Sequence, residues 1–335
     1  MPRISQERKR TVTIIDAHIH YGDDDPDFLR LLEELDIKLL NITLVQSHDS
    51  RWREQADRYR DLAQRYPQRF SWCTSIDLPR FDDPDYANFA ILGLDRDFEN
   101  KAVACKIWKN IGMEVKNPAG DYVMIDDPIF APIFKHIAAR GRALLLHIAE
   151  PLACWQPLDE NNPHYGYYSR NPQWHMYGKS DVPSHADLIA ARDRVVEKNL
   201  NLRIIGAHLG SLEHDVDEVA KRLDAYPNFA VDISARLADL ARQDSSKVRQ
   251  FFIDYQDRIL FGTDMVMGTP ISQMAPAEKA EALARIRETY EMHFAYLEKS
   301  GPVTVRGYET EGLHLPPEVL EKVYRRNAQR WYAGV

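Results

Sequence analysis

Eight short apolar runs, separated by stretches with helical periodicity, constrain the fold of this chain more than any other feature of its sequence. The runs span residues 11–18, 39–46, 70–77, 101–108, 142–150, 202–209, 228–234 and 258–264. Nearly continuous apolar runs of this length are typical of parallel strands whose two faces are both covered. The stretches between them repeat hydrophobic residues with the spacing of amphipathic helices, at 27–36, 58–67, 129–141, 187–199, 215–227 and 246–256.

The spacing of the runs predicts how the strands close on one another. From His18 to Asp264 the strand–helix unit recurs about every 35 residues, which suits an eightfold barrel of about 250 residues. A doubly wound open sheet is the alternative, but no glycine-rich phosphate loop follows the first run. We therefore predict an α/β fold, a (β/α)8 TIM barrel that forms a single domain over residues 1–335. It should carry a long loop after strand five and C-terminal helices, the last of them at 316–332.

Composition excludes several classes of protein. The 43 Lys and Arg against 51 Asp and Glu give a net charge of −8, whereas a nucleic-acid binder usually shows a basic stripe. No run reaches the ~18 apolar residues of a membrane span, and the N-terminus lacks the apolar region of a signal peptide. The three cysteines, Cys73, Cys105 and Cys154, form no CxxC pair. We expect a cytoplasmic protein that acts on a small molecule, without nucleic-acid or membrane partners; a homodimer is left open.

The first run ends in two histidines, in the sequence IIDAHIH at 14–20. Residues i and i+2 of a strand point to the same side. Asp16, His18 and His20 should therefore share the face that looks into the barrel, and the apolar Ile15, Ala17 and Ile19 should face the helices.

Further histidines and an aspartate end other strands. His147 closes the fifth run, His208 the sixth and Asp264 the eighth. Taken singly, each has an ordinary explanation, such as a buried core histidine or a helix N-cap. Together they lie at the C-terminal mouth, where the active sites of barrel enzymes are found. Imidazole nitrogens with a carboxylate suit a divalent cation, so the pattern predicts a metal centre.

These residues resemble the amidohydrolase superfamily, and most closely its amidohydrolase-related branch. That branch includes aminocarboxymuconate semialdehyde decarboxylase and other decarboxylases as well as lactone hydrolases. The resemblance rests on the phrases DAHIHYG, LLLHIAEP, IIGAHLGS, ILFGTD and VYRRNAQR. It extends from about Ile14 to Arg330, nearly the whole chain.

The resemblance implies a set of roles. His18, His20, His147 and Asp264 would bind one divalent ion, most commonly Zn²⁺, with a water that loses a proton near neutral pH. Asp264 would also accept that proton. His208 would orient the water or stabilise negative charge that develops on the substrate.

Lys106, which should point inward near the end of the fourth run, has three interpretations. In some members of the superfamily a carboxylated lysine at this place bridges a second metal ion. In others an inward lysine holds a carboxylate of the substrate. The third interpretation is an ion pair with Asp16 or Asp232, because a buried ammonium needs a partner. Asp16 is also a candidate partner for the free ring nitrogen of a metal-bound histidine.

A long loop after the fifth run, 150–186, is rich in Trp, Tyr, His and Asn and should overhang the mouth. Trp155 and Trp174 are candidate substrate contacts, together with Lys106. Flat aromatic walls with a few polar groups suit an aromatic or conjugated carboxylic acid. Arg236, just past the seventh run, is the candidate clamp for its carboxylate.

Two reactions fit this site. The leading interpretation is a metal-dependent hydrolase of an ester, lactone or amide of a small organic acid, and the alternative is a metal-dependent non-oxidative decarboxylase. A barrel that binds ligands without turnover would show a missing metal ligand, and none is missing. A phosphoesterase of another His-x-His barrel family would need ligands on strands two and three, where only His48 and Asp77 occur.

Overall fold

The computed structural model describes residues 13–335. Eight parallel strands form one sheet in chain order, each hydrogen-bonded to the next. The strands are β1 (Ile14–Ile19), β2 (Ile37–Ile42), β3 (Phe70–Ser75), β4 (Ala104–Ile107), β5 (Ala143–Leu146), β6 (Arg203–Gly206), β7 (Phe229–Asp232) and β8 (Ile259–Leu260). Each lies within or overlaps one of the eight predicted runs, so the predicted (β/α)8 barrel is confirmed.

The seam between β8 and β1 is bridged by backbone hydrogen bonds beyond the short β8. The N–H of Ala17 donates to Phe261 O at 2.9 Å, and that of Asp264 donates to His18 O at 2.8 Å. These bonds bring the segment that carries Asp264 against the strand that carries the first two histidines.

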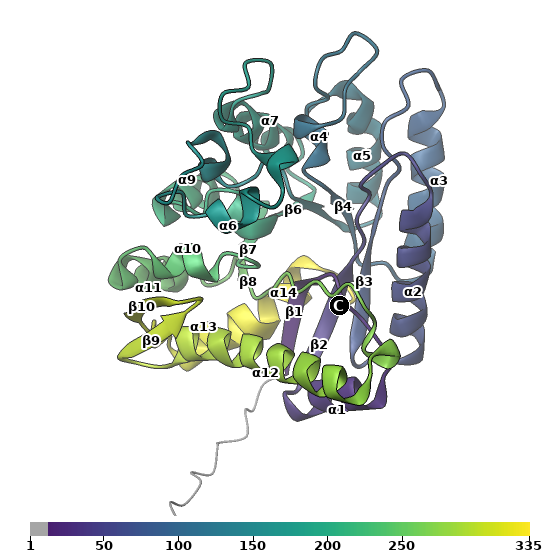
Figure 1. Cartoon of the computed structure of the whole chain (residues 1–335). Helices are drawn as coiled ribbons and strands as arrows, with labels where there is room; N and C mark the ends of the chain where they lie inside the picture. Colours follow the sequence, from purple (N-terminus) through teal and green to yellow (C-terminus); the bar gives the residue numbers. More distant parts are fainter. Residues whose placement is uncertain (1–12) are drawn as a thin grey trace, which may run out of the picture.

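Helices surround the strands. They are α1 (Pro26–Glu34), α2 (Arg51–Arg65), α3 (Tyr86–Glu99), α4 (Asn110–Met113), α5 (Ala131–Ala139), α6 (Tyr165–Tyr168), α7 (His185–Lys198), α8 (Ala207–Gly210), α9 (Val216–Ala225), α10 (Leu237–Ala241), α11 (Ser245–Asp254), α12 (Pro276–Glu298), α13 (Pro317–Glu321) and α14 (Asn327–Trp331). In Figure 1, α2 and α3 lie on the right of the view and α9, α10 and α11 on the left. Short 3₁₀ turns and an antiparallel hairpin, β9 (Pro302–Val305) with β10 (Tyr308–Glu311), complete the fold.

Polar residues fix where several helices begin. The side chains of Asp25, Asp215 and Asp244 accept backbone N–H groups in the first turns of α1, α9 and α11. Ser184 and Asp187 form a reciprocal capping box at the start of α7. Such caps satisfy N–H groups that have no partner within the helix. The start of α7 is therefore well defined, and this helix packs behind the mouth of the barrel.

The interior of the barrel holds its own apolar core. All eight strands contribute side chains to this core. They include Ile15, Ala17, Leu40, Ile42, Cys73, Ala104, Leu145, Ile205, Ala230 and Leu260. The prediction that Ile15 and Ala17 face the helices is therefore wrong. The pairing of β1 with β2 shifts register between Asp16 and Ile19, and this irregularity reverses the simple alternation of the strand.

The C-terminal segment closes the bottom of the barrel. Trp331 and Tyr332 join the inner core, and Asn327 donates to the carbonyl of Ile259 at 2.7 Å. A π-helical turn, Lys322–Arg326, connects α13 and α14, and its Val323 carbonyl accepts the N–H of Phe261 at 3.0 Å. The predicted closing helix is thus present, interrupted by this turn.

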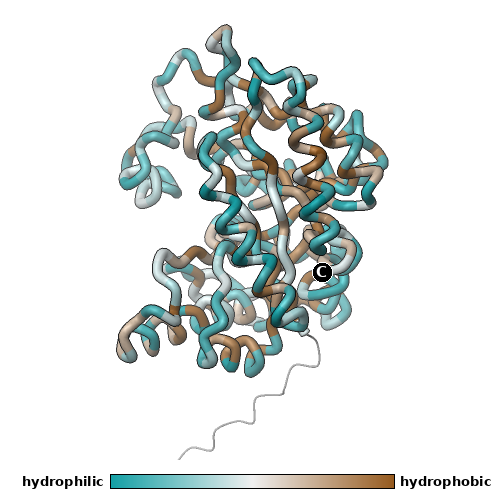
Figure 2. Tube along the Cα trace, turned by 90° about the vertical axis from the view of Figure 1, so that its right-hand side faces the viewer, coloured by the Kyte–Doolittle hydropathy of each residue, from teal (hydrophilic) through white to brown (hydrophobic). Residues whose placement is uncertain are grey.

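Hydrophobic and hydrophilic residues separate as expected for such a barrel. In Figure 2 the brown, hydrophobic stretches gather toward the middle of the trace, and teal segments dominate its outer turns. Within residues 13–335 no helix has the length and apolar character needed to cross a membrane.

We predict that His293, buried in α12, makes the fold sensitive to acid. Burial lowers the pKa of His293 to about 4, with a further contribution from the charge of Arg306. The unfolded chain binds a proton near pH 6.5 and the folded chain only near pH 4, so stability falls as the pH decreases through this range. The loss is about 3 kcal/mol for this one group.

Urea unfolding of the wild type and of His293→Asn at pH 7 and pH 4.5 measures this effect. Asn keeps a donor for the Thr289 carbonyl, which the ring nitrogen Nδ1 contacts at 2.7 Å. The variant should lose less stability on acidification than the wild type. Equal losses in the two proteins would contradict the assignment.

Candidate functional site

Four histidine rings form a continuous row at the C-terminal ends of the strands. The rings of His20 and His18 have centroids 5.2 Å apart, His18 stacks on His208 at 4.8 Å, and His208 meets the edge of His147 at 4.3 Å. His18 lies on β1, the other three lie just after the ends of β1, β5 and β6, and all four are buried. The structure thus brings together the four histidines that the sequence singled out.

Asp264 completes one end of the row. Its Oδ1 lies 3.2 Å from Nε2 of His20 and 3.8 Å from Nε2 of His18. Burial alone would raise the pKa of Asp264, but the charge of His208 and the hydrogen bond to His20 hold it below its usual value. The side chain is 24% exposed, so it lies between the buried rings and the open mouth. His18, His20 and Asp264 are close enough to share a metal ion.

The hydrogen bonds of the rings orient their Nε2 atoms. Nδ1 of His18 lies 2.8 Å from Asp232, Nδ1 of His20 lies 2.7 Å from Ile42 O, and Nδ1 of His208 lies 2.9 Å from Ser234 O. Each partner is an acceptor, so the proton of the neutral ring belongs on Nδ1 and the lone pair on Nε2.

His147 differs from the other three rings. Its Nε2 is buried and has no hydrogen-bond partner among residues 13–335. A buried nitrogen without a partner is costly, and coordination to a metal ion would satisfy it. Histidines that bind metals characteristically donate their second nitrogen to a carboxylate or a carbonyl, as the other rings do here. His18, His20 and Asp264 therefore fit a divalent ion, and His147, whose ring meets His208, is a further candidate ligand outside that close group.

Asp232, at the end of β7, is the buried carboxylate that holds this arrangement. It accepts Nδ1–H of His18, the backbone N–H of His208 at 2.9 Å and the N–H of Ser234 at 3.1 Å. Burial disfavours its charge, but the interactions with His18 outweigh this and hold the pKa of Asp232 below its usual value.

Asp16 does not partner a histidine ring. It lies on β1 but accepts the backbone N–H of His18, both the N–H and the hydroxyl of Thr263, and the hydroxyl of Tyr290 at 2.9 Å. Tyr290 belongs to α12, so Asp16 faces outward and the prediction that it shares the inner face with His18 is wrong. Its bonds to Thr263 fix the segment that presents Asp264.

The chain leaves β6 through a left-handed turn that carries His208. Four consecutive residues, His208, Leu209, Gly210 and Ser211, have φ values of 59°, 58°, 63° and 58°. This conformation costs about 1–2 kcal/mol for each residue other than glycine. Tertiary contacts must therefore hold the turn.

Lys106 is completely buried on β4, with Nζ 3.2 Å from Nε2 of His18. Burial lowers the pKa of Lys106 to about 8, and the charges of Asp232 and Asp264 oppose the effect. Among the described residues no carboxylate lies within 4.0 Å of Nζ, so the third interpretation of Lys106, a direct ion pair with Asp16 or Asp232, is not supported.

Arg236 follows β7 and is only 8% exposed. Its Nη1 donates to Ala235 O at 3.3 Å, and its Nε has no partner in the part of the chain that the structure describes. Burial lowers the pKa values of His147 and His208, and the charge of Arg236 lowers both of them further. Arg236 is therefore a buried cation beside the row of rings.

The long loop after β5 supplies one wall of the mouth. Lys109 binds the carboxylate of Glu150 and donates to the hydroxyl of Tyr167 at 3.1 Å. Its ammonium also lies 4.2 Å from the ring centroid of Trp174, which packs edge-on against Trp108 at 5.2 Å.

Trp155 has a different environment from Trp174. It donates to Pro183 O and packs against His185 at the start of α7. The structure does not bring it to the histidine row, so its predicted contact with substrate has no support in these packing partners.

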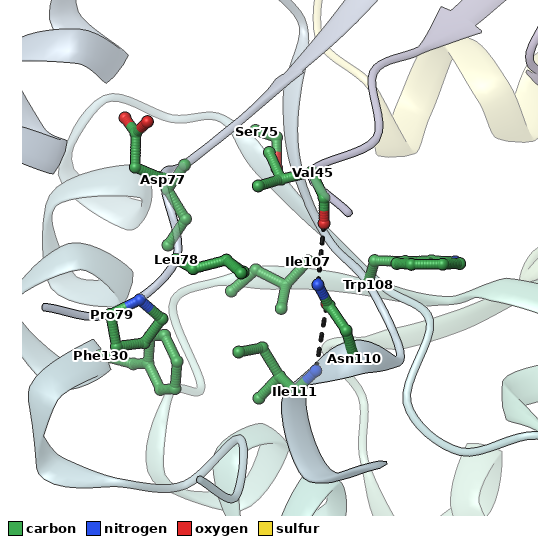
Figure 3. Close-up of a pocket in the computed structure, with 11 residues that line it drawn as sticks. Val45, Ser75, Asp77, Leu78, Pro79, Ile107, Trp108, Asn110, Ile111 and Phe130 are labelled. Carbon is green, nitrogen blue, oxygen red and sulfur yellow. Dashed lines mark hydrogen bonds between the residues drawn. The ribbon is translucent and has the colours of Figure 1, made fainter. Parts of the chain in front are cut away.

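A small, mainly apolar pocket lies beyond the ends of β2, β3 and β4. Figure 3 shows Leu78, Ile107, Ile111 and Phe130 pointing toward one another, with Asn110 donating to Val45 O at 2.9 Å. None of the histidines or Asp264 lines it. It is separate from the histidine row.

Some residues of the site escaped the sequence analysis. Asp232 and Ser234 were not assigned to the histidines, although the alternation in VDIS hinted at two polar groups on one face. Lys109 and Glu150 were also missed, because nothing in their local sequence indicates that they meet. Glu150 does lie three residues after His147, in the phrase LLLHIAEP.

A sequence model of the amidohydrolase family matches residues 15–334, so the chain belongs to this family. A search of curated protein sequences found no match.

Solved structures share the fold at low sequence identity. A 2,6-dihydroxybenzoate decarboxylase from Rhizobium is 17% identical with a TM-score of 0.55, covering 96% of this chain and 98% of the other. A dihydroxybenzoic acid decarboxylase from Polaromonas sp. JS666, with bound manganese and 2-nitroresorcinol, is 18% identical with a TM-score of 0.53, covering 93% and 87%. A 4-oxalomesaconate hydratase from Rhodopseudomonas palustris is 12% identical with a TM-score of 0.53, covering 96% of each chain.

We predict that Asp232→Asn weakens metal binding. Asparagine can still accept the Nδ1–H of His18, but it loses the negative charge that makes the ring a better ligand. Changes to such outer partners typically cost about 10–100-fold in metal affinity. Titration calorimetry with Mn²⁺ on metal-stripped protein measures the difference.

Asp239→Asn is the matched control, because Asp239 is also buried but binds His164 and Arg242. It should bind Mn²⁺ like the wild type. Unchanged affinity in Asp232→Asn, in a protein that circular dichroism shows to be folded, would contradict the role of Asp232.

Proposed function

We propose that this protein is a metal-dependent, non-oxidative decarboxylase of an aromatic or conjugated carboxylic acid. The observation that carries the proposal is a pair of buried cations, Lys106 and Arg236, beside the histidine row. Among residues 13–335, neither has a carboxylate within 4.0 Å. Acids act on both cations only at longer range, Asp232 and Asp264 on Lys106, and Glu213, Asp239 and Glu150 on Arg236. Buried charges are normally paired, and a substrate carboxylate would supply a direct partner.

The metal ion would be held by His18, His20, His147 and Asp264. When bound, it supplies a positive charge that polarises the substrate and lowers the pKa of a coordinated water. Zinc is the ion that the resemblance to the amidohydrolase superfamily implies, and manganese is present in the Polaromonas structure. The protein should therefore be tested with each of these two ions.

The protein's own groups provide the remaining chemistry. A proton adds to the ring carbon that bears the carboxylate, the C–C bond breaks, and its electron pair restores the ring as CO₂ leaves. Lys106 and Arg236 would hold the carboxylate in place. Asp264, the partly exposed member of the site, would carry the proton at its carboxylate, and Nε2 of His208 would hydrogen-bond a polar group of the substrate.

The wall formed by Trp108, Tyr167 and Trp174 supports a planar substrate. Aromatic side chains pair with other rings through offset or edge contacts that contribute about 0.5–1.5 kcal/mol each. The similar fold of two decarboxylases that act on dihydroxybenzoic acids is consistent with this choice. Hydrolysis, the leading interpretation from the sequence alone, would use the same residues and is the other outcome of the experiment.

The reaction can be identified by its products. Protein loaded with Mn²⁺ or Zn²⁺ is incubated with a panel of hydroxylated benzoic acids, conjugated dicarboxylic acids and aryl lactones. CO₂ is measured by mass spectrometry and acid release by a pH-stat. We expect CO₂ in stoichiometric amounts with the decarboxylated ring. Acid release from a lactone without CO₂ would contradict the proposal and identify the reaction as hydrolysis.

We predict that two histidine variants separate metal binding from turnover. His147→Ala should lose metal and activity together, because Nε2 of His147 is a buried nitrogen without a partner among residues 13–335. His208→Ala should keep its metal content while kcat falls, since Nδ1 of His208 is bound to Ser234 and its Nε2 would face the substrate. Elemental analysis and steady-state kinetics measure both. Loss of metal in His208→Ala would make His208 a ligand instead.

A further inference from the structure

The left-handed turn that presents His208 is held from one side by helix α7. A Cβ atom on Gly206 would lie 2.9 Å from the Cα of Gly210, so the turn folds back tightly onto the end of β6. A Cβ on Gly210 would lie 2.7 Å from Nη1 of Arg192. The turn therefore fits between its own strand and this arginine.

Arg192 is a fully buried arginine in the middle of α7. Its Nη1 donates to the carbonyl oxygen of Gly210, its Nε and Nη2 donate to Asp193 at 3.0 and 2.6 Å, and its guanidinium lies 5.0 Å from the ring centroid of Phe229. The contacts with Asp193 and Phe229 therefore fix the position of the guanidinium independently of its bond to the turn. A buried charge with this set of partners provides a rigid support.

A second side chain of α7 binds the next part of the turn. The ring Nε2 of His185 lies 2.9 Å from the carbonyl oxygen of Ser211, and the Ser211 hydroxyl donates to Ala149 O at 2.9 Å. Two consecutive carbonyls of a strained turn are therefore bound from α7.

The opposite side of the turn is held by β7. The N–H of His208 donates to Asp232 and its Nδ1 to Ser234 O, each at 2.9 Å. With the backbone fixed by α7 and Nδ1 fixed by β7, the direction of Nε2 of His208 has no remaining freedom.

We propose that Arg192 is a positioning residue: through the carbonyl of Gly210 it holds the left-handed turn in the conformation that directs Nε2 of His208 into the mouth. Arg192 is too deeply buried behind the turn to meet a substrate. The effect on turnover rests on the proposed function of His208, whereas the effect on the position of the ring does not.

The test compares Arg192→Met with Arg192→Lys and with Arg194→Met as control. Arg194 lies on the same helix, but its side chain is 47% exposed and binds Asp126. The ring signals of His208, assigned by their loss in His208→Ala, are followed by ¹⁵N NMR of histidine-labelled protein. They should shift in Arg192→Met, shift less in Arg192→Lys, which retains a donor, and stay in place in Arg194→Met.

Kinetics supply the second readout. Arg192→Met should lower kcat by up to about a hundredfold, the cost of displacing a reacting group by roughly 1 Å, with KM and metal content unchanged. In the His208→Ala background the same substitution should have no further effect on kcat, because its target is gone.

Unchanged His208 signals in a folded Arg192→Met protein would overturn the proposal, as would an equal loss of kcat in the presence and absence of the His208 ring. If Arg192→Met does not fold, Arg192→Lys decides by the same two criteria. A wild-type protein that turns over no acid would refute the proposed function, and the NMR comparison would still judge the role of Arg192.

Discussion

The buried carboxylate of Asp232 is the interaction on which the rest of the site depends. It joins β7 to β1 through the ring of His18 and to β6 through the backbone of His208. An isolated buried charge would be very unfavourable, but the carboxylate of Asp232 accepts hydrogen bonds from the ring of His18 and from the backbone N–H groups of His208 and Ser234. Because the carboxylate fixes Nδ1 of His18, it also determines that Nε2 faces Lys106 and Asp264. The geometry of the candidate metal centre thus follows from one anion.

The site is also a place of conformational strain. Each of the last four strands of the barrel, β5 to β8, is followed by a residue other than glycine with positive φ: Ala149 at 68°, His208 at 59°, Ala235 at 57° and Asp264 at 58°. At about 1–2 kcal/mol each, these conformations together cost about 4–8 kcal/mol. Backbone strain of this kind gathers at functional sites and persists where surrounding contacts over-determine it. Asp232, Arg192 and the Asp16–Thr263 hydrogen bonds are contacts of that type.

The sequence alone predicted the barrel and the residues at its mouth because both are repeating features. Eight apolar runs at regular spacing define the strands, and polar residues at their ends are visible without knowing the structure. The inward face of β1 was misassigned because a register shift cannot be read from alternation. The role of Asp232 toward His18 was missed because the two lie 214 residues apart.

The two longest of the helices that were not predicted, α3 and α12, escaped prediction for opposite reasons. Helix α3 exposes Phe89 and Leu92, 45% and 70% accessible, so its pattern is not cleanly amphipathic. Helix α12 buries polar groups, among them His293 and the hydroxyl of Tyr290 that binds Asp16. In both, the tertiary contacts of the helix, rather than its local pattern, determine which side faces the barrel.

The central claim, that the histidine row and Asp264 form a metal centre, is tested most directly by anomalous diffraction from crystals grown with Mn²⁺. We expect one strong peak bounded by His18, His20, His147 and Asp264, with Lys106 free of metal. A second peak against Lys106 would assign that residue as a carboxylated bridge between two ions. Crystals at saturating Mn²⁺ without a peak among these side chains would show that the histidine row and Asp264 do not form a metal centre.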